Sequence, residues 1–227
     1  KKVRRLAYNT KNSELQDIEK LYRSDAMLVG GKAANLGELN KIRLINNKRL
    51  PLPEGAFAIP FFWYKNHLTT NGIQLAIDSL VADPDCINSS AQLKIRLKNI
   101  QKRIKNSPLD PLLVHKIKDK ITRNGLSYST YRFRSSTNAE DIKGFNGAGL
   151  YTSKSVILGS EEKSIEKAIR QVWASLWDER AFAERAYFNL DQSTVFMAIL
   201  VHRAFGTELA NGVALTKHLY RENYPSY

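Results

Sequence analysis

The strongest constraint on the fold is a repeating pattern of apolar side chains in residues 90–106. Four aliphatic residues recur there at spacings of 4, 3 and 4, namely Leu93, Leu97, Ile100 and Ile104. These spacings align them on one face of an α-helix, and that face has to be buried against another element. The chain has 227 residues, of which 43% are hydrophobic. It is therefore long enough for a sizeable core, in one large domain or two small lobes.

Similar patterns predict the other elements. Helices are expected at residues 13–22, 33–42, 60–64, 111–123 and 161–187, and strands at 56–59, 129–135, 194–202 and 212–216. Trp173 and Trp177 flank the apolar side of the helix expected at 161–187, which favours a place in the core over contact with a cofactor. We predict an α+β (mixed α/β) fold in which a small mixed sheet, containing 129–135 and 194–202, packs against that helix.

The charge of the chain admits two interpretations. The formal net charge is +13, with much of it on the helices expected at 90–106 and 111–123. A basic surface of this kind can bind nucleic acid or another polyanion. However, no Phe or Tyr is interleaved with the basic residues of these helices for stacking on bases. The pattern favours solvated helix faces, and a nucleic-acid-binding module is kept as the rival interpretation.

Cysteine content and hydropathy indicate the compartment. The single cysteine, Cys86, excludes a disulfide framework and favours a reducing cytoplasm. No segment approaches the roughly 20 apolar residues needed to cross a bilayer. No signal peptide is visible behind Lys1–Arg5, and the chain does not begin with Met, so we interpret the sequence as a fragment.

The first segment with recognisable chemistry is Gly30-Gly31-Lys32, at the start of the helix expected at 33–42. Glycines let backbone N–H groups turn toward a ligand, and a helix N-terminus favours an anion. The lysine adds a mobile positive charge, so the segment suits a phosphate. The spacing of the glycines is not that of a Walker A motif. An ordinary loop with a solvated lysine explains the same residues.

Two further segments could also contact phosphate. Arg134, at the end of the strand expected at 129–135, could bind phosphate oxygens through both arms of its guanidinium, or could instead form a salt bridge with Glu140 or Asp141. The stretch from Gly144 to Ser153 contains three glycines in six residues: Gly144, Gly147 and Gly149. Such a loop can close over phosphates, although a simple hairpin would use the same glycines.

The order of these segments resembles the N-terminal part of pyruvate phosphate dikinases and phosphoenolpyruvate synthases. Five motifs occur in the same order: Gly30–Leu36, Leu52–Gly55 with Ala58–Pro60, Arg134–Ser136 with Ala139–Asp141, the glycine loop, and Gln171–Trp177 followed by Ala210–Ala214. Glucan water dikinases and rifampicin phosphotransferases share the pattern. The resemblance covers residues 25–217. Each motif is weak alone, whereas their order is specific to the family.

The resemblance implies an ATP-grasp-like nucleotide site between two lobes. The catalytic residues implied are Lys32 and Arg134, which match family residues that contact ATP phosphates. The full ATP-binding set implied is Gly30, Gly31, Lys32, Arg134, Gly144, Gly147, Gly149, Ser153 and His202. His202 stands where many members carry a glutamine near the adenine, so the detail of that contact differs here. Ser153 stands where many members have threonine, and a hydroxyl is retained.

The resemblance also indicates which parts of the enzyme lie elsewhere. In the family a second ATP-grasp lobe follows the strand expected at 212–216 and supplies acidic magnesium ligands. A phosphohistidine domain and a pyruvate-binding barrel come later. Residues 1–227 are thus expected to be the N-terminal part of the nucleotide-binding domain, truncated before the second lobe, with no metal ligands of its own. None of His67, His115, His202 and His218 has the sequence context of the phosphorylated histidine, so the fragment alone is not expected to catalyse the full reaction.

The expected function of the parent enzyme is a phosphotransferase reaction that uses ATP and Mg²⁺. ATP phosphorylates an enzyme histidine, which then passes the phosphoryl group to pyruvate. Glucan or an antibiotic is the alternative acceptor within the family. The rival from another class, a non-catalytic basic module that binds nucleic acid, predicts steep salt dependence without competition from ATP.

Overall fold

The fold is built on one antiparallel sheet. The computed structural model describes residues 3–123, 128–140, 145, 147, 149–206, 210 and 212. The strands have the order β1-β2-β5-β3-β4 and are β1 (Gln16–Asp17), β2 (Phe57–Ile59), β3 (Thr130–Thr137), β4 (Lys154–Ile157) and β5 (Met197–Arg203). The α+β class is confirmed. The sheet is not mixed, however, because every strand pair among the described residues is antiparallel.

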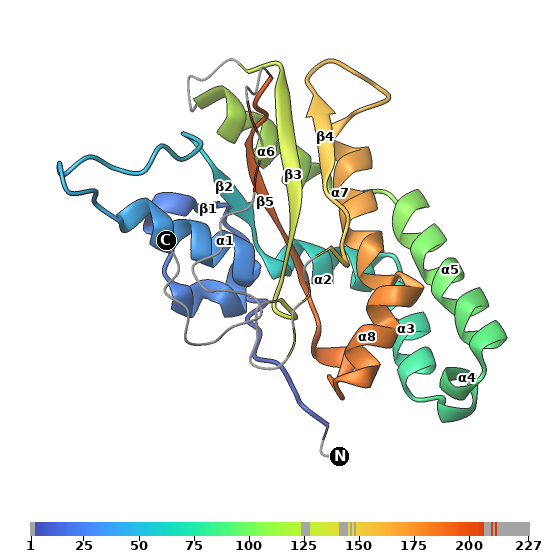
Figure 1. The fold of residues 1–227 in the computed structure, drawn as a ribbon. Coiled ribbons are helices and arrows are strands. Elements are labelled where there is room, and N and C mark those ends of the chain that lie inside the picture. Colours follow the sequence, from blue (N-terminus) through green and yellow to red (C-terminus); the bar gives the residue numbers. More distant parts are fainter. Residues whose placement is uncertain are drawn as a thin grey trace, which may run out of the picture.

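Helices cover both faces of this sheet (Figure 1). They are α1 (Ala26–Lys41), α2 (Phe61–Thr70), α3 (Ile73–Val81), α4 (Pro84–Asn88), α5 (Ser90–Asn106), α6 (Pro111–Arg123), α7 (Ile165–Ala174) and α8 (Glu179–Tyr187). Helix α7 packs on β3, β4 and β5, and α5 packs against α7 as an outer layer. Helix α1 packs on β2, β3 and β5.

The alternation of side chains along β2 and β5 shows that α1 and α7 lie on opposite faces of the sheet. Ala58 and Leu200 are paired across β2 and β5, and both belong to the apolar cluster around α1. Their neighbours Ile59 and Ile199 are also paired and belong to the larger core with α7. Because successive strand residues point to opposite sides, α1 covers one face and the α7 layer covers the other.

Most of the strongly periodic segments fold as predicted. In α5, Leu97, Ile100 and Ile104 are buried and Leu93 is partly buried. Helix α6 spans the predicted residues, and β3 and β5 pair with each other and pack against α7, as expected. Trp173 and Trp177 are both buried in the core, which confirms their predicted place.

Two predicted helices are wrong. Residues 13–22 contain β1 and a 3-10 turn at Ile18–Lys20, because Gln16 and Asp17 pair with β2 while Ile18 packs toward α1. The helix predicted at 161–187 is divided into α7, a 3-10 turn and α8. The division occurs at Asp178, whose backbone is extended and whose carboxylate accepts a hydrogen bond from the Arg180 N–H as the N-cap of α8.

Other predicted elements were incomplete. Helix α1 begins at Ala26, seven residues before the predicted start at residue 33, and bends at Gly30. The sequence patterns missed α3, α4 and β4. The strand predicted at 212–216 lies, apart from Gly212, outside the described residues.

His67 is a buried, neutral histidine of the core. Its Nε2 lies 3.2 Å from the carbonyl oxygen of Ile104, and its Nδ1 lies 3.2 Å from the side-chain nitrogen of Asn71. A carbonyl oxygen can only accept, so Nε2 carries the proton and Nδ1 accepts from the Asn71 amide. Burial is the main cause that lowers the pKa of His67 below its ordinary value of 6.5.

We expect the protein to lose stability below about pH 6.5, the ordinary pKa of histidine. Because the folded pKa of His67 is lowered, the unfolded chain binds a proton first. The contribution is complete above the unfolded pKa and is lost as pH falls toward the folded pKa, with a slope of at most about 1.4 kcal/mol per pH unit. Urea unfolding at pH 7.5 and 5.5 checks this. His67→Phe should reduce the difference between the two pH values, whereas His115→Phe, at an exposed position, should not; an unchanged difference in His67→Phe would contradict the assignment.

Candidate functional site

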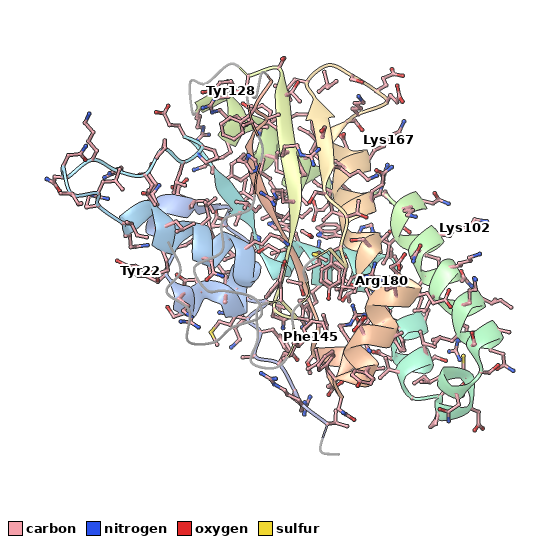
Figure 2. The ribbon with its side chains drawn as sticks, viewed as in Figure 1. Tyr22, Lys102, Tyr128, Phe145, Lys167 and Arg180 are labelled. Atoms are coloured by element: carbon pink, nitrogen blue, oxygen red, sulfur yellow. The ribbon has the colours of Figure 1, made fainter. Side chains whose placement is uncertain are left out.

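A cavity of about 680 Å³ lies at the end of the sheet where β3 begins. Tyr128 marks this end in Figure 2, and Phe145 lies near the opposite end. The cavity is lined by Tyr128, Ser129, Thr130, Arg132, Arg134, Ser153, Ser155, His202, Ala204, Phe205 and Gly206. We call it the β3 cavity. Basic, hydroxyl and aromatic side chains therefore converge in one place from three strands.

The β3 cavity is on the face of the sheet that α1 covers elsewhere. Arg134 is paired with Leu200, which packs against α1. Arg132 lies two residues before Arg134 and is paired with both His202 and Ser155. Paired residues and residues two apart share a face, so all of these side chains project to the α1 side.

Arg134 lines the cavity with a guanidinium that no described residue engages. It is exposed, although its neighbours Phe133 and Ser135 are buried. Its side chain forms no hydrogen bond or ion pair with a described residue. Of the two predicted alternatives, the salt bridge from Arg134 to Glu140 is thus not formed, and Asp141 lies outside the described residues. Arg132 differs, because its guanidinium donates to the Ser155 hydroxyl over 2.7 Å.

His202 lies in the field of these arginines. Its pKa is lowered from the ordinary value of 6.5, first by burial and then by the charges of Arg134, Arg132 and Arg203. The Arg203 guanidinium lies 4.6 Å from the centroid of the Phe205 ring and 5.3 Å from that of Tyr128. The cavity is therefore positively charged, and His202 is neutral near pH 7.

Ser153 is held at the rim by a buried arginine. Arg185 is completely buried and donates to the side-chain oxygen of Gln192 over 2.7 Å and to the hydroxyl of Tyr151 over 3.4 Å. The adjacent Thr152 N–H donates to the Ser175 hydroxyl over 3.1 Å. These contacts anchor Tyr151 and Thr152, the two residues that precede Ser153. The core therefore determines where the Ser153 hydroxyl lies.

The Gly30-Gly31 segment forms a kink that is joined to β3. Gly30 has φ 79° and ψ 169°, inside an otherwise helical α1. The Ser136 hydroxyl donates to the Val29 carbonyl over 2.7 Å and accepts from the Ala33 N–H over 3.0 Å. It satisfies the two backbone groups that the kink leaves without helical partners. Gly30 therefore has a packing role that the sequence analysis did not anticipate.

Lys32 is engaged by a carboxylate. Its ammonium forms an ion pair with Glu140, whose side chain is only 3% exposed. Lys32 does not line the β3 cavity. Gly31 and Glu140 line a second cavity of about 500 Å³, which also contains Arg4, Arg5 and Arg23. Lys32 and Arg134 thus share the α1 side of the sheet, and only Arg134 projects into the β3 cavity.

The structure brings together some of the predicted site residues. Arg134, Ser153 and His202 share the β3 cavity. Gly147 and Gly149 line neither cavity, and Gly144 lies outside the described residues. The sequence analysis missed Arg132, Ser155, Tyr128 and Phe205 as cavity residues. The alternation of Arg132 and Arg134 with Tyr131 and Phe133 was the signal that could have placed both arginines on one face.

The described residues contain neither a cluster of metal ligands nor a helix that could span a membrane. No group of three His, Cys, Asp or Glu side chains in these residues is arranged to hold a metal ion. In the same part of the chain, no helix has the length and apolar character required to cross a bilayer.

Comparison with known proteins identifies the family. The family model described as pyruvate phosphate dikinase, AMP/ATP-binding domain, matches residues 26–225. The chain is 29% identical over 205 residues to a probable phosphoenolpyruvate synthase of Methanothermobacter thermautotrophicus, covering 88% of this chain and 28% of that protein. It is 30% identical over 207 residues to a rifampicin phosphotransferase of Bacillus subtilis, covering 89% of this chain and 22% of that protein. The chain therefore spans about a quarter of the length of these relatives, and it belongs to the pyruvate phosphate dikinase AMP/ATP-binding domain family.

Proposed function

We propose that the β3 cavity binds ATP and that the chain is the nucleotide-binding part of a phosphotransferase. One observation carries the proposal: the Arg134 guanidinium, which pairs with none of the described residues, shares a cavity with Ser153 and His202, in a member of an AMP/ATP-binding domain family. A guanidinium in such a position can bind two phosphate oxygens at once. The cavity has the volume of a small-molecule site.

Each side chain has a proposed role. Arg134 neutralises phosphate charge, and the Ser153 hydroxyl donates a hydrogen bond to a phosphate oxygen. Lys32 supplies a second positive charge once its ammonium exchanges Glu140 for the triphosphate. Because that ammonium is held by a buried carboxylate, it is ordered before the nucleotide arrives. Gly30, Gly31, Gly147 and Gly149 shape the backbone around these groups, and Gly144 belongs to the same proposed loop.

The proposed reaction is the transfer of a phosphoryl group from ATP to an enzyme histidine and then to pyruvate. Relatives named phosphoenolpyruvate synthase and rifampicin phosphotransferase match to a similar extent, so an antibiotic is an alternative acceptor. Glucan is a further alternative, on the sequence resemblance alone. Magnesium, when bound, would neutralise phosphoryl charge. The described residues do not supply a cluster of ligands for it, so another part of the protein would hold it. We place the reaction in the cytoplasm, because the only cysteine is free and buried.

We further propose that this chain is one lobe of an ATP-grasp-like site. Arg134 is exposed although it lines the cavity, so a bound phosphate would stay in contact with water unless another lobe covered it. Solvent screens charge contacts. The chain alone is therefore expected to bind ATP weakly and to lack dikinase activity.

The rival module that binds nucleic acid has less support. Much of the positive charge on α5 and α6 is already paired within the chain. The pairs are Lys94–Glu179, Arg96–Asp83, Lys116–Glu14, Lys120–Asp17 and Arg123–Asp119. Phosphate contacts by these residues would have to replace existing ion pairs.

ATP binding to the full-length protein distinguishes the two functions. We expect saturable binding that requires Mg²⁺ and that a DNA oligonucleotide does not displace. Arg134→Ala should weaken it at least about 10-fold, because a charge-assisted hydrogen bond is worth roughly 1.5–3 kcal/mol. Arg180→Ala, at an exposed position of α8, is the matched control and should bind normally. Binding of DNA with steep salt dependence and no competition from ATP would instead support the basic module.

A further inference from the structure

We propose that a cavity between α6 and α7 binds a small monocarboxylate with an aliphatic tail. The cavity has a volume of about 450 Å³. It is lined by Pro108, Leu109, Pro111, Val114, His115, Lys118, Glu166 and Arg170. We call it the α6–α7 cavity. It shares no lining residue with the β3 cavity, so the inference does not rest on the proposed function.

The α6–α7 cavity and the β3 cavity lie on opposite sides of the sheet. Helix α7 covers the face away from α1, whereas the β3 cavity is on the α1 side. Helix α6 packs into the same core as α7, through the buried Leu113 and Ile117. Glu166 and Arg170 are one helical turn apart on α7, next to the buried Ile169. A ligand held by Arg170 would therefore be separated from the β3 cavity by the sheet.

Arg170 supplies the group that would recognise the carboxylate. Its side chain forms no hydrogen bond or ion pair with a described residue, although Glu166 is only one helical turn away. The Nε atom is buried without a hydrogen-bond partner among the described residues, whereas the two terminal nitrogens remain accessible. Those terminal N–H groups can donate to both oxygens of a carboxylate at once.

The charges around the cavity match a single negative charge. Lys118 is a second cation that forms no ion pair with a described residue. Glu166 is the one carboxylate in the wall. His115 has its own acidic neighbour, Asp119, at 3.7 Å. Two cations and one carboxylate leave one positive charge unbalanced, so the cavity favours a monoanion and disfavours another cation.

The remaining wall is apolar. Pro108, Leu109, Pro111 and Val114 have no polar side-chain atom. Leu109 is buried, and Val114 packs partly against the core. Such a wall offers water no hydrogen bond, so an aliphatic tail would displace water favourably. A carboxylate at Arg170 with its tail along this wall uses both parts of the cavity, whereas an inorganic anion would use only one.

Binding of five small molecules to the full-length protein tests the assignment. Acetate, butyrate and hexanoate carry the same carboxylate on tails of increasing length. We expect affinity to increase about twofold or more for each added CH₂, because each methylene removes apolar surface from water. 1-Hexanol and hexylamine have the tail without the negative charge, and should bind at least about 10-fold more weakly than hexanoate. Saturation-transfer difference NMR measures all five.

Variants locate the binding. Arg170→Met removes the guanidinium but keeps an unbranched side chain, so it should weaken hexanoate at least about 10-fold and leave 1-hexanol unchanged. It should unfold at the same temperature as wild type or a higher one, because the guanidinium has no partner among the described residues. Val114→Ala shortens the apolar wall and should reduce the gain per CH₂. Lys102→Ala, at an exposed position of α5, and Arg134→Ala, in the β3 cavity, should both bind hexanoate normally.

Four outcomes would overturn the inference. Hexanoate may fail to bind, or may bind no more tightly than acetate, in which case no apolar cavity receives the tail. Equal binding of 1-hexanol and hexanoate would mean that the charge plays no part. Wild-type binding of hexanoate by Arg170→Met, with loss in Arg134→Ala, would place the acid in the β3 cavity. ATP binding to the same protein is measured separately, so none of these outcomes affects the proposed function.

Discussion

Replacing Gly30 by alanine should lower the free energy of unfolding by about 2–6 kcal/mol, the largest effect on stability that we expect from a single methyl group. Two costs add. At φ 79° and ψ 169° the backbone is in a region that is essentially restricted to glycine, with a cost of roughly 1–3 kcal/mol. A Cβ at Gly30 would also lie 2.3 Å from the backbone carbon and oxygen of Ser136. Neither atom can rotate away, so α1 and β3 would have to separate, at a further cost of about 1–3 kcal/mol.

A second glycine, Gly159, allows the cost of backbone strain to be measured apart from the cost of the clash. Gly159 also has a positive φ, of 83°, but a Cβ there would meet no atom within 4 Å. Gly159→Ala should therefore show backbone strain without the clash and lose only about 1–2 kcal/mol. Urea unfolding of both variants measures the difference. Equal losses at the two positions would mean that Ser136 and α1 are not in close contact.

Removing the Arg134 guanidinium should reduce the turnover of the full-length enzyme by on the order of 10²-fold or more, if the proposed function is correct. Arg134 is the arginine of the β3 cavity that has no partner among the described residues, so its charge is available for phosphate. A preorganised donor that meets developing charge is worth about 2.7–4 kcal/mol in the transition state. Because Arg134 is exposed and not part of the core, Arg134→Ala should unfold at the same temperature as wild type.

Lys32→Ala should differ from Arg134→Ala in its kinetic pattern. The lysine is proposed to bind ground-state ATP as well, so we expect a larger rise in the KM for ATP. The mutation also removes the ammonium that forms an ion pair with the buried Glu140 carboxylate, which should reduce stability. Unfolding of each variant is checked first, and steady-state kinetics then measure turnover and the KM for ATP. Arg180→Ala and Lys102→Ala, at exposed positions, are the controls. If Arg134→Ala and Lys32→Ala both keep wild-type turnover and KM, the phosphate-site assignment is wrong.

The parts of the fold that could be predicted are those with a strong local pattern. Leu97, Ile100 and Ile104 are buried on α5 because helical spacing alone places them on one face. One wrong prediction occurred where a tertiary contact outweighed a local pattern, because Gln16 and Asp17 pair with β2 in place of a helix. The other missed a local signal, because Asp178 caps a new helix through the Arg180 N–H inside a segment that reads as one helix.

The sequence suggested residues for the candidate site but not the partners of those residues. Arg134, Ser153 and His202 were expected together and do share the β3 cavity. The sequence analysis suggested Glu140 as a partner of Arg134, whereas it pairs with Lys32 over a separation of 108 residues. No sequence spacing predicts a contact between residues this far apart in the chain, because the contact depends on how closely α1 approaches β3.

The sequence by itself determined the α+β class, the apolar faces of the helices and the family resemblance. These follow from local periodicity and from the order of motifs, which do not depend on how elements meet. Only the tertiary structure decided that Gly30 packs on Ser136 and that Lys32 is held by Glu140. Each of these contacts depends on distances between atoms of different elements. A linear pattern of residue types does not contain such distances.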